Sequence, residues 1–269
     1  MTLDFHSRPT LVAYLTCGDP DLRTTREVAL AAIDAGVEVI ELGVPFSDPV
    51  ADGPVIQRAS ERALQNGVTL EQVLNLAAEV RRESDAGLII FSYLNPALRM
   101  GLDNFSAKSA DAGVDGALIT DLPVEEATEY LRAMRKRNLA TVFLAAPTST
   151  DERLKCIAEA STGFVYAVSR TGVTGAQKEL PEDAQKLVQR LRKVTKLPIA
   201  VGFGISAPEQ FASVGKYADA AVVGSAIVQL IESSPGKEAH AVAEFVKQLS
   251  AGSHQASGKI TPLRVGGAR

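Results

Sequence analysis

Glu41 is the residue whose type and position in the sequence most strongly suggest chemistry. It follows Val39 and Ile40 inside an apolar run, where an acidic side chain is unexpected. Strand side chains alternate between two faces, so Glu41 shares a face with Val39 and Gly43. If that face is buried, desolvation disfavours the carboxylate and raises its pKa. Such a group suits general acid and base catalysis near neutral pH. A carboxylate that reaches solvent at the end of the strand would fit the same pattern.

Asp52 is the second acidic candidate, in the long loop 44–54 that follows this run. A carboxylate near the mouth of a site could accept a hydrogen bond from a substrate N–H or O–H group. Asp48 and Asp52 could equally be polar caps, because Gly53 and Pro54 are typical of the start of a helix. From these residues alone, both interpretations stay open.

Glycines follow two of the later apolar runs and indicate a phosphate site. Gly202-Phe203-Gly204 precedes a helix that Ser206 could cap, and Gly224-Ser225 opens another helix. Glycines let backbone N–H groups approach a phosphate, and helix N-termini attract anions. Ordinary tight turns would also use these glycines. The polar loop 169–180, which is rich in glycine and threonine, could be a lid that closes over a substrate, or only a connection.

Aromatic side chains stand close to the ends of several predicted strands. They could form an apolar pocket for a flat ring, or simply belong to the core, and they are Phe91, Tyr93, Tyr166 and Phe203. We expect Cys17 to be a small buried residue, because no histidine stands near it in the sequence to activate a thiol.

The positioning elements are eight short, almost continuously apolar runs, typical of parallel strands that are covered on both faces. Amphipathic stretches, such as 24–34, 124–137 and 183–193, alternate with them. This regular alternation predicts a single (β/α)8 TIM barrel, with its active site at the carboxyl ends of the strands. A doubly wound open sheet is less favoured, because no G-x-G-x-x-G pattern follows the first run. The predicted strands are 10–16, 37–43, 87–93, 116–121, 140–146, 164–169, 198–204 and 220–226.

Composition narrows the class of protein further. The chain has 269 residues, 46% of them hydrophobic, and a formal charge of −4, which does not favour binding to nucleic acid. Its two cysteines and three histidines do not cluster as metal ligands, and no metal site is expected. The sequence shows neither a membrane span nor a signal peptide, so we expect a cytoplasmic protein. Residues 1–250 are predicted to form one catalytic barrel domain and 251–269 a flexible tail.

The run ELGVPFSDPVADGP (41–54) closely resembles a signature of the tryptophan synthase alpha chain family. Six further motifs resemble the same family in the same order: YLTCGDP, SYLNP, TDLPVEE, YAVSRTGVTG, GFGIS and GSAIV. The resemblance implies the retro-aldol cleavage of indole-3-glycerol phosphate to indole and glyceraldehyde 3-phosphate, in L-tryptophan biosynthesis. It implies no cofactor bound by this chain.

Carried over motif by motif, the resemblance assigns roles to individual residues. Glu41 would move protons to indole C3 and from the glycerol hydroxyl, and Asp52 would hold the indole N–H. Thr174 would approach Asp52 when the loop closes. Tyr166 matches the family's tyrosine near the end of strand 6. The remaining matches and candidates are Gly175, Phe203, Gly204, Gly224 and Ser225 for the phosphate, and Tyr14, Phe91, Tyr93 and Phe203 for the indole ring.

The resemblance also implies a partner, a separate beta chain that carries pyridoxal phosphate, in an αββα heterotetramer. The loop 45–52 and the region after Asn95 would face it. One departure is the short leader before Thr10, where family members often have a helix that covers the bottom of the barrel. Other phosphate-binding barrel enzymes remain alternatives, although no predicted strand carries the lysine that a Schiff-base aldolase needs. A non-catalytic subunit is not indicated, because both Glu41 and Asp52 are present.

Overall fold

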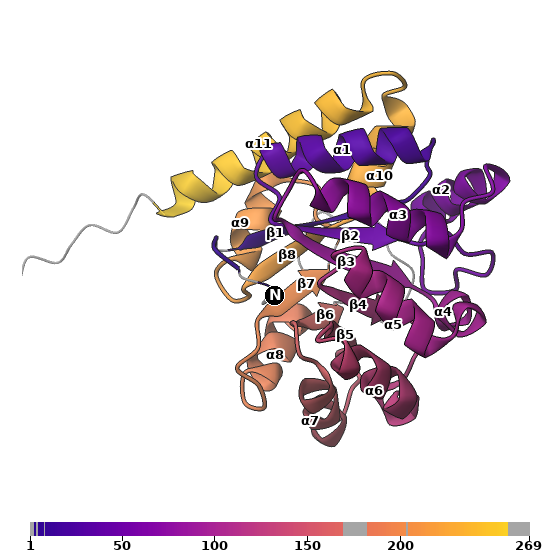
Figure 1. Cartoon of the computed structure of the whole chain (residues 1–269). Coiled ribbons are helices and arrows are strands. Elements are labelled where there is room, and N and C mark those ends of the chain that lie inside the picture. Colours follow the sequence, from indigo (N-terminus) through magenta and orange to yellow (C-terminus); the bar gives the residue numbers. More distant parts are fainter. Residues whose placement is uncertain (1–2, 4, 8, 169–181, 203, 258–269) are drawn as a thin grey trace, which may run out of the picture.

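Eight parallel strands close into a barrel in the order in which they occur in the chain (Figure 1). The computed structural model describes residues 3, 5–7, 9–168, 182–202 and 204–257, with the backbone alone for 252–257. Strand β1 pairs with β2 on one side and with β8 on the other, which closes the sheet. The predicted (β/α)8 barrel is therefore confirmed. Its strands are β1 (Thr10–Thr16), β2 (Val39–Gly43), β3 (Gly87–Ser92), β4 (Gly116–Ile119), β5 (Ala140–Ala145), β6 (Val165–Val168), β7 (Ile199–Gly202) and β8 (Ala220–Val223).

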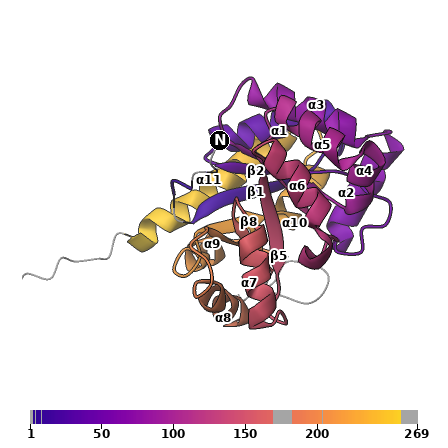
Figure 2. The same ribbon diagram turned by 60° about the horizontal axis from the view of Figure 1, so that its bottom comes forward.

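Helices surround the barrel, with α7 and α8 on the side opposite α1 and α3 (Figures 1 and 2). Two helices each follow β2, β3 and β8, so the chain carries more than one helix per strand at these places. The helices are α1 (Leu22–Asp34), α2 (Pro54–Gln65), α3 (Leu70–Arg81), α4 (Leu94–Met100), α5 (Leu102–Asp111), the 3₁₀ helix η1 (Val124–Glu126), α6 (Thr128–Lys136), α7 (Asp151–Ala160), α8 (Glu182–Leu191), α9 (Pro208–Val214), α10 (Ser225–Ser233) and α11 (Glu238–Ser257).

Alternation along the strands divides the core into two layers. Ile40 and Leu42 point outward and pack in the large cluster beneath the helices. Val39, on the opposite face, belongs to the cluster that fills the barrel interior together with Val12 and Ile89. Glu41 lies on the face of Val39 and therefore points into the barrel. Apolar residues on both faces explain why these strands read as continuous hydrophobic runs.

Side chains of the short leader cover the bottom of the barrel. Leu3 and Phe5 pack against the interior cluster, and the Phe5 ring lies 5.7 Å from that of Phe164. The Glu38 carboxylate accepts a hydrogen bond from the His6 backbone N–H at 2.8 Å and anchors the segment to the start of β2. Leu3 and Phe5 thus supply apolar contacts at the end of the barrel where the resemblance led us to expect a helix.

Three local predictions differ from the structure. The stretch 124–137 is not one helix, because η1 ends at Glu126 and α6 begins at Thr128. Ser206 does not cap α9; Ala207 is the N-cap, and the Gln210 side chain accepts from the backbone N–H of both residues. Helix α11 continues to Ser257 and extends past the edge of the barrel in both views, so its first residues beyond 250 are helical rather than a loose tail. Leu249 belongs to the core, and helical hydrogen bonding beyond it does not require burial.

Candidate active site

Glu41 lies inside the barrel, on β2, with Tyr14 of β1 and Ile89 of β3 as its register partners. Its side chain is fully buried, and neither carboxyl oxygen has a hydrogen-bond partner within the described part of the chain. Burial raises the pKa of Glu41 from its ordinary value of 4.5 to about 8. At neutral pH this carboxyl group is therefore mostly protonated and able to donate a proton.

Asp52 is also buried but has a partner. It lies in the loop between β2 and α2, and its Oδ2 accepts a hydrogen bond of 3.1 Å from the Tyr93 hydroxyl. Burial raises the pKa of Asp52 to about 6, while the Tyr93 hydrogen bond opposes the rise. Helix α2 begins after Gly53, which is its N-cap. The geometry therefore favours a site carboxylate over a helix cap, and it leaves Asp52 mostly ionised at neutral pH.

Tyr93 does more than line a pocket. Besides donating to Asp52, its hydroxyl oxygen accepts from the Ala51 backbone N–H at 3.0 Å. Its ring stacks on Phe46, with 4.8 Å between the ring centroids. Tyr93 thus fixes both ends of the loop that carries Asp52. Sequence reasoning placed this ring in the indole pocket and missed the role of its hydroxyl and of Phe46, since only the folded path of the loop brings them together.

Tyr14 and Tyr166 bring further hydroxyl groups close to the two carboxyls. A Cβ on Gly43 would lie 2.4 Å from the Tyr14 hydroxyl oxygen, and one on Gly202 would lie 2.3 Å from that of Tyr166. Each tyrosine therefore requires a glycine on the neighbouring strand. Burial, and then the negative charges of Asp52 and Glu41, raise the pKa of Tyr14. Burial, followed by the charges of Glu41 and Asp52, does the same to the pKa of Tyr166, so all four groups share one electrostatic environment.

The predicted ring and phosphate contacts that the structure describes fall at the same end of the barrel. Phe91 packs edge-on against Tyr14, with 5.0 Å between the ring centroids. Gly204 follows β7, and Gly224 is the N-cap of α10, whose first residue is Ser225. A Cβ on Gly224 would lie 3.3 Å from the Cβ of Tyr14, which joins the predicted phosphate end to the ring end. Thr174, Gly175 and Phe203, together with the predicted lid 169–180, lie outside the described residues.

Features elsewhere in the molecule are separate from this site. Cys17 is fully buried, as predicted. Among the described residues, no group of three His, Cys, Asp or Glu side chains is placed to hold a metal ion. No helix in that part of the chain is both long and apolar enough to cross a membrane.

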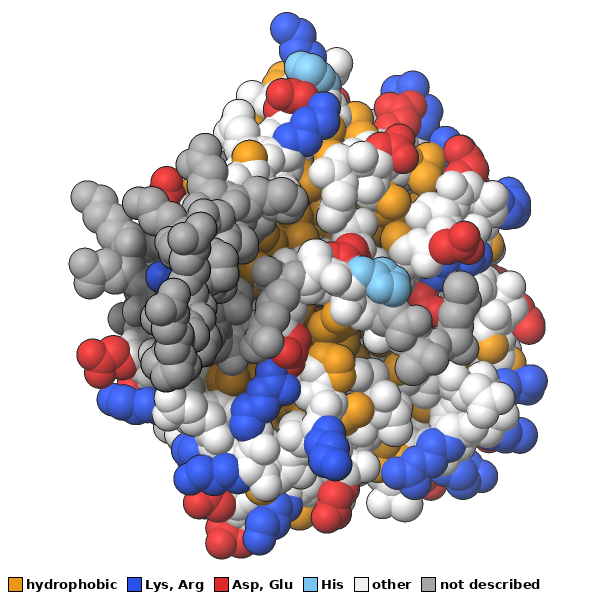
Figure 3. Space-filling model, turned by 90° about the vertical axis from the view of Figure 1, so that its left-hand side faces the viewer, with side chains coloured by type: hydrophobic (Ala, Val, Ile, Leu, Met, Phe, Trp, Pro, Cys, Tyr) orange, Lys and Arg blue, Asp and Glu red, His pale blue; other side chains and the backbone are white. Residues whose placement is uncertain are grey.

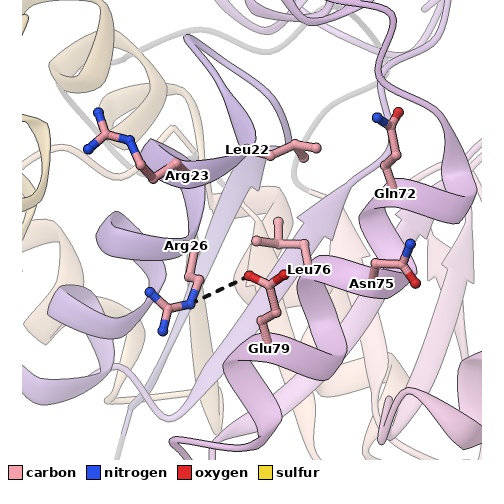
Figure 4. Close-up of a pocket in the computed structure, with 7 residues that line it drawn as sticks. All are labelled: Leu22, Arg23, Arg26, Gln72, Asn75, Leu76 and Glu79. Atoms are coloured by element: carbon pink, nitrogen blue, oxygen red, sulfur yellow. Dashed lines mark ion pairs between the residues drawn. The ribbon is translucent and has the colours of Figure 1, made fainter.

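The face in Figure 3 shows acidic and basic side chains interspersed along its edges. A polar groove of about 440 Å³ lies between α1 and α3, in the outer layer (Figure 4).

Together, the fold and the site define a (β/α)8-barrel enzyme with two buried carboxyls of different pKa beside a helix N-terminus. The family model described as "Tryptophan synthase alpha chain" matches residues 2–257. The alpha chain of Solibacter usitatus is 52% identical over 248 residues, which cover 91% of this chain and 93% of that protein. The alpha chain of Dehalococcoides mccartyi is 48% identical over 245 residues, covering 91% of this chain and 95% of its own.

Solved structures agree with these relatives. Mycobacterium tuberculosis tryptophan synthase superimposes with a TM-score of 0.86 at 38% identity, over 91% of this chain and 93% of the other. The tryptophan synthase A-subunit of Pyrococcus furiosus gives a TM-score of 0.85 at 41% identity, over 91% and 98%. The chain belongs to the tryptophan synthase alpha chain family. The reaction of that family is the aldolase-type cleavage of indole-3-glycerol phosphate.

Proposed function

We propose that Glu41 carries out the proton transfers of this cleavage, while Asp52, as an anion, holds the indole N–H. The observation that carries the proposal is their difference in pKa, about 8 for Glu41 and about 6 for Asp52. Two carboxyls whose pKa values lie on opposite sides of neutral can act as acid and as anion at the same pH.

The bond to be broken joins indole C3 to the carbon that carries the first hydroxyl of the glycerol chain. Protonated Glu41 donates its proton to C3, and the ionised Asp52 accepts a hydrogen bond from the indole N–H, which is becoming positive. Glu41, now a carboxylate, takes the proton of the hydroxyl. The C–C bond then breaks, its electrons return to the ring, and indole and the aldehyde form. Glu41 ends the cycle protonated, so the step needs no other proton donor.

The apolar surroundings of Glu41 support this role. Neither of its oxygens is engaged by a protein donor within the described residues, so the carboxyl is free to meet a substrate. Phe91 and Tyr14 offer ring surfaces on the adjacent strands, as a planar indole requires. The α10 N-terminus at Ser225 offers backbone N–H groups to a phosphate.

A beta chain is the partner that the family implies, and the finer proposal is an αββα assembly. Two large apolar side chains support a protein contact over the barrel mouth. Val50, in the loop that carries Asp52, is 81% exposed, and Leu98 on α4 is 52% exposed. They lie in the two regions where the sequence resemblance placed the partner. Exposed apolar residues at the mouth of a site are typical of protein contacts.

The test is release of glyceraldehyde 3-phosphate from indole-3-glycerol phosphate by the purified chain, with and without a tryptophan synthase beta chain. We expect slow release alone and a sharp rise with the beta chain. Release that the beta chain does not change would overturn the partner proposal only. No release from the folded chain in either condition would overturn the proposed reaction.

A further inference from the structure

An ion-pair network joins three elements at the rim of the barrel mouth. Arg62, on α2, donates from Nε and Nη2 to the two carboxylate oxygens of Asp19, at 2.7 Å each. Its Nη1 donates to Glu232 of α10 at 2.8 Å. Arg58, one turn earlier on α2, pairs with both oxygens of Glu232, at 3.1 and 2.8 Å. We call Asp19, Arg58, Arg62 and Glu232 the rim network.

Arg62 is the centre of the rim network, since it alone contacts both carboxylates. Asp19 is buried in the loop after β1, so its charge has little water to solvate it. Bidentate arginine–carboxylate pairs fix the relative orientation of the two side chains as well as the distance between them. Hydrogen bonds from Arg58 and Arg62 hold the pKa of Glu232 at about 2, so this carboxylate is charged at neutral pH.

Beneath the network, α2 and α10 pack together over a residue of the site. Ile56 and Ala59 of α2 and Val228 of α10 form one apolar cluster with Tyr14. The Asn66 side chain, just after α2, donates to the Pro20 carbonyl at 2.6 Å and ties this end of the helix to the loop of Asp19. Polar and apolar contacts thus set the placement of α2 against α10.

The first turns of these two helices carry the two ends of the predicted substrate site. The Gln57 side chain, in the first turn of α2, donates to the Asp52 carbonyl at 2.8 Å, so Asp52 moves with α2. Helix α10 starts at Ser225, the predicted phosphate end. A change in the placement of α2 against α10 would therefore change the separation between Asp52 and the phosphate site.

We infer that Arg62, through Asp19 and Glu232, is a positioning residue that sets the distance between the half-site for the ring and the half-site for the phosphate. This inference rests on the proposed function, because it takes the two half-sites from there. A ligand that spans both half-sites gains from their correct separation, as two linked binding groups do. A ligand that fills only one half-site gains nothing from it.

Arg26 provides a matched control in the outer helical layer. It joins two helices as Arg62 does, pairing from α1 with Glu79, at 3.6 Å, and with Glu83. The side chains are similarly exposed, 31% for Arg26 and 33% for Arg62. Arg26 lies on the groove between α1 and α3, where its guanidinium points toward Glu79 (Figure 4). Neither carboxylate partner of Arg26 belongs to a helix that starts at the site.

The experiment compares a two-ended ligand with its fragments in four proteins: the unchanged chain, Arg62→Gln, Arg62→Lys and Arg26→Gln. The two-ended ligand is indole-3-propanol phosphate, which lacks the hydroxyls needed for cleavage, and the fragments are indole and glycerol 3-phosphate. The chain contains no tryptophan, so the fluorescence of the indole ring, excited at wavelengths that tyrosine does not absorb, reports its binding. Calorimetry measures glycerol 3-phosphate.

We expect Arg62→Gln to weaken binding of the two-ended ligand about tenfold and each fragment less than about twofold. Arg62→Lys should bind the two-ended ligand better than Arg62→Gln but less well than the unchanged chain, because lysine keeps the charge but not the bidentate geometry. Arg26→Gln should change none of the three affinities. Equal losses for the ligand and its fragments, or no loss at all, would overturn the inference.

Circular dichroism shows whether the Arg62 variants are folded. If they are not, Glu232→Gln provides a second test of the inference. It removes the α10 partner while the Arg62–Asp19 pair remains, and it should show the same selective loss, smaller in size. Failure of the proposed function has a separate signature, because the unchanged chain would then not cleave indole-3-glycerol phosphate. An unchanged chain that binds the two-ended ligand no better than the fragments would overturn the inference itself.

Discussion

Glu41 and Asp52 carry the same functional group in two different surroundings. Glu41 stands on a strand, inside the barrel, with no hydrogen-bond donor among the described residues. Asp52 stands in a loop, and the Tyr93 hydroxyl donates to it. Both are buried, yet the pKa rises to about 8 in the first case and only to about 6 in the second. The comparison teaches that one buried hydrogen-bond donor, the Tyr93 hydroxyl, helps to keep the pKa of Asp52 below that of Glu41. One carboxyl group is then ionised at a pH where the other is protonated.

Removing the acidic proton of Glu41 should have the largest effect. Glu41→Gln keeps the size of the side chain but cannot donate and regain a proton, so cleavage should fall by about 10³-fold or more. Glyceraldehyde 3-phosphate release measures the loss, and binding of indole-3-propanol phosphate checks that the site is intact. A variant with more than a tenth of the original activity would remove Glu41 from the chemistry.

Removing the charge of Asp52 should have the next largest effect. Asp52→Asn should lower kcat/KM by about 10²-fold, since it loses the anion opposite the indole N–H. In the unchanged chain, kcat/KM should rise through about pH 6, as Asp52 ionises, and fall through about pH 8, as Glu41 loses its proton. The Asn variant should lose the acidic limb and keep the alkaline one. An acidic limb that persists in Asp52→Asn would assign it to another group.

Tyr93→Phe should make the surroundings of Asp52 more like those of Glu41. The hydrogen bond from Tyr93 lowers the pKa of Asp52, so its loss should raise that pKa and move the acidic limb to higher pH. One hydrogen bond is worth about 1 kcal/mol, which corresponds to a loss of roughly fivefold in activity on the acidic side of pH 6 and of about threefold at pH 6 itself. The Phe46 stack should persist in this variant because the ring is kept. A limb that does not move would show that the hydroxyl serves the loop rather than the carboxylate.

The last prediction concerns stability rather than rate. Folding raises the pKa of Glu41 from 4.5 to about 8, so the folded chain holds the extra proton between these values. The contribution of Glu41 to the free energy of unfolding therefore falls as the pH rises from 4.5 to about 8, and it stays constant at higher pH. Glu41→Gln lacks this penalty, and its stability relative to the unchanged chain should increase from pH 5 to pH 8, by up to a few kcal/mol. Urea unfolding at both pH values measures the difference, and a constant difference would contradict the raised pKa.

Local patterns in the sequence predicted the barrel and the place of Glu41 well. The regular alternation of apolar runs with amphipathic stretches indicated the barrel, and the alternation of side chains along a strand placed Glu41 with Val39. The hydroxyl of Tyr93 could not be foreseen in the same way, since its partner Asp52 lies on a different loop and the contact depends on how that loop folds back. The cap of α9 shows a smaller failure. Ser206 is a good capping residue, but α9 begins one residue later than predicted, and the Gln210 side chain accepts from the backbone N–H groups of Ser206 and Ala207. The end of α11 could not be predicted from periodicity, because the sequence after Leu249 loses the regular spacing of apolar residues.

The packed interior below Glu41 limits the paths by which a reaction product can leave the site. Val12, Val39 and Ile89 fill the barrel on that side, and Leu3 and Phe5 close it from beneath. Among the described residues, a small apolar product formed beside Glu41 therefore meets packed side chains on that side, and its path leads toward the mouth of the barrel. A protein that receives this product directly would have to contact the mouth of the barrel, where Val50 and Leu98 are exposed.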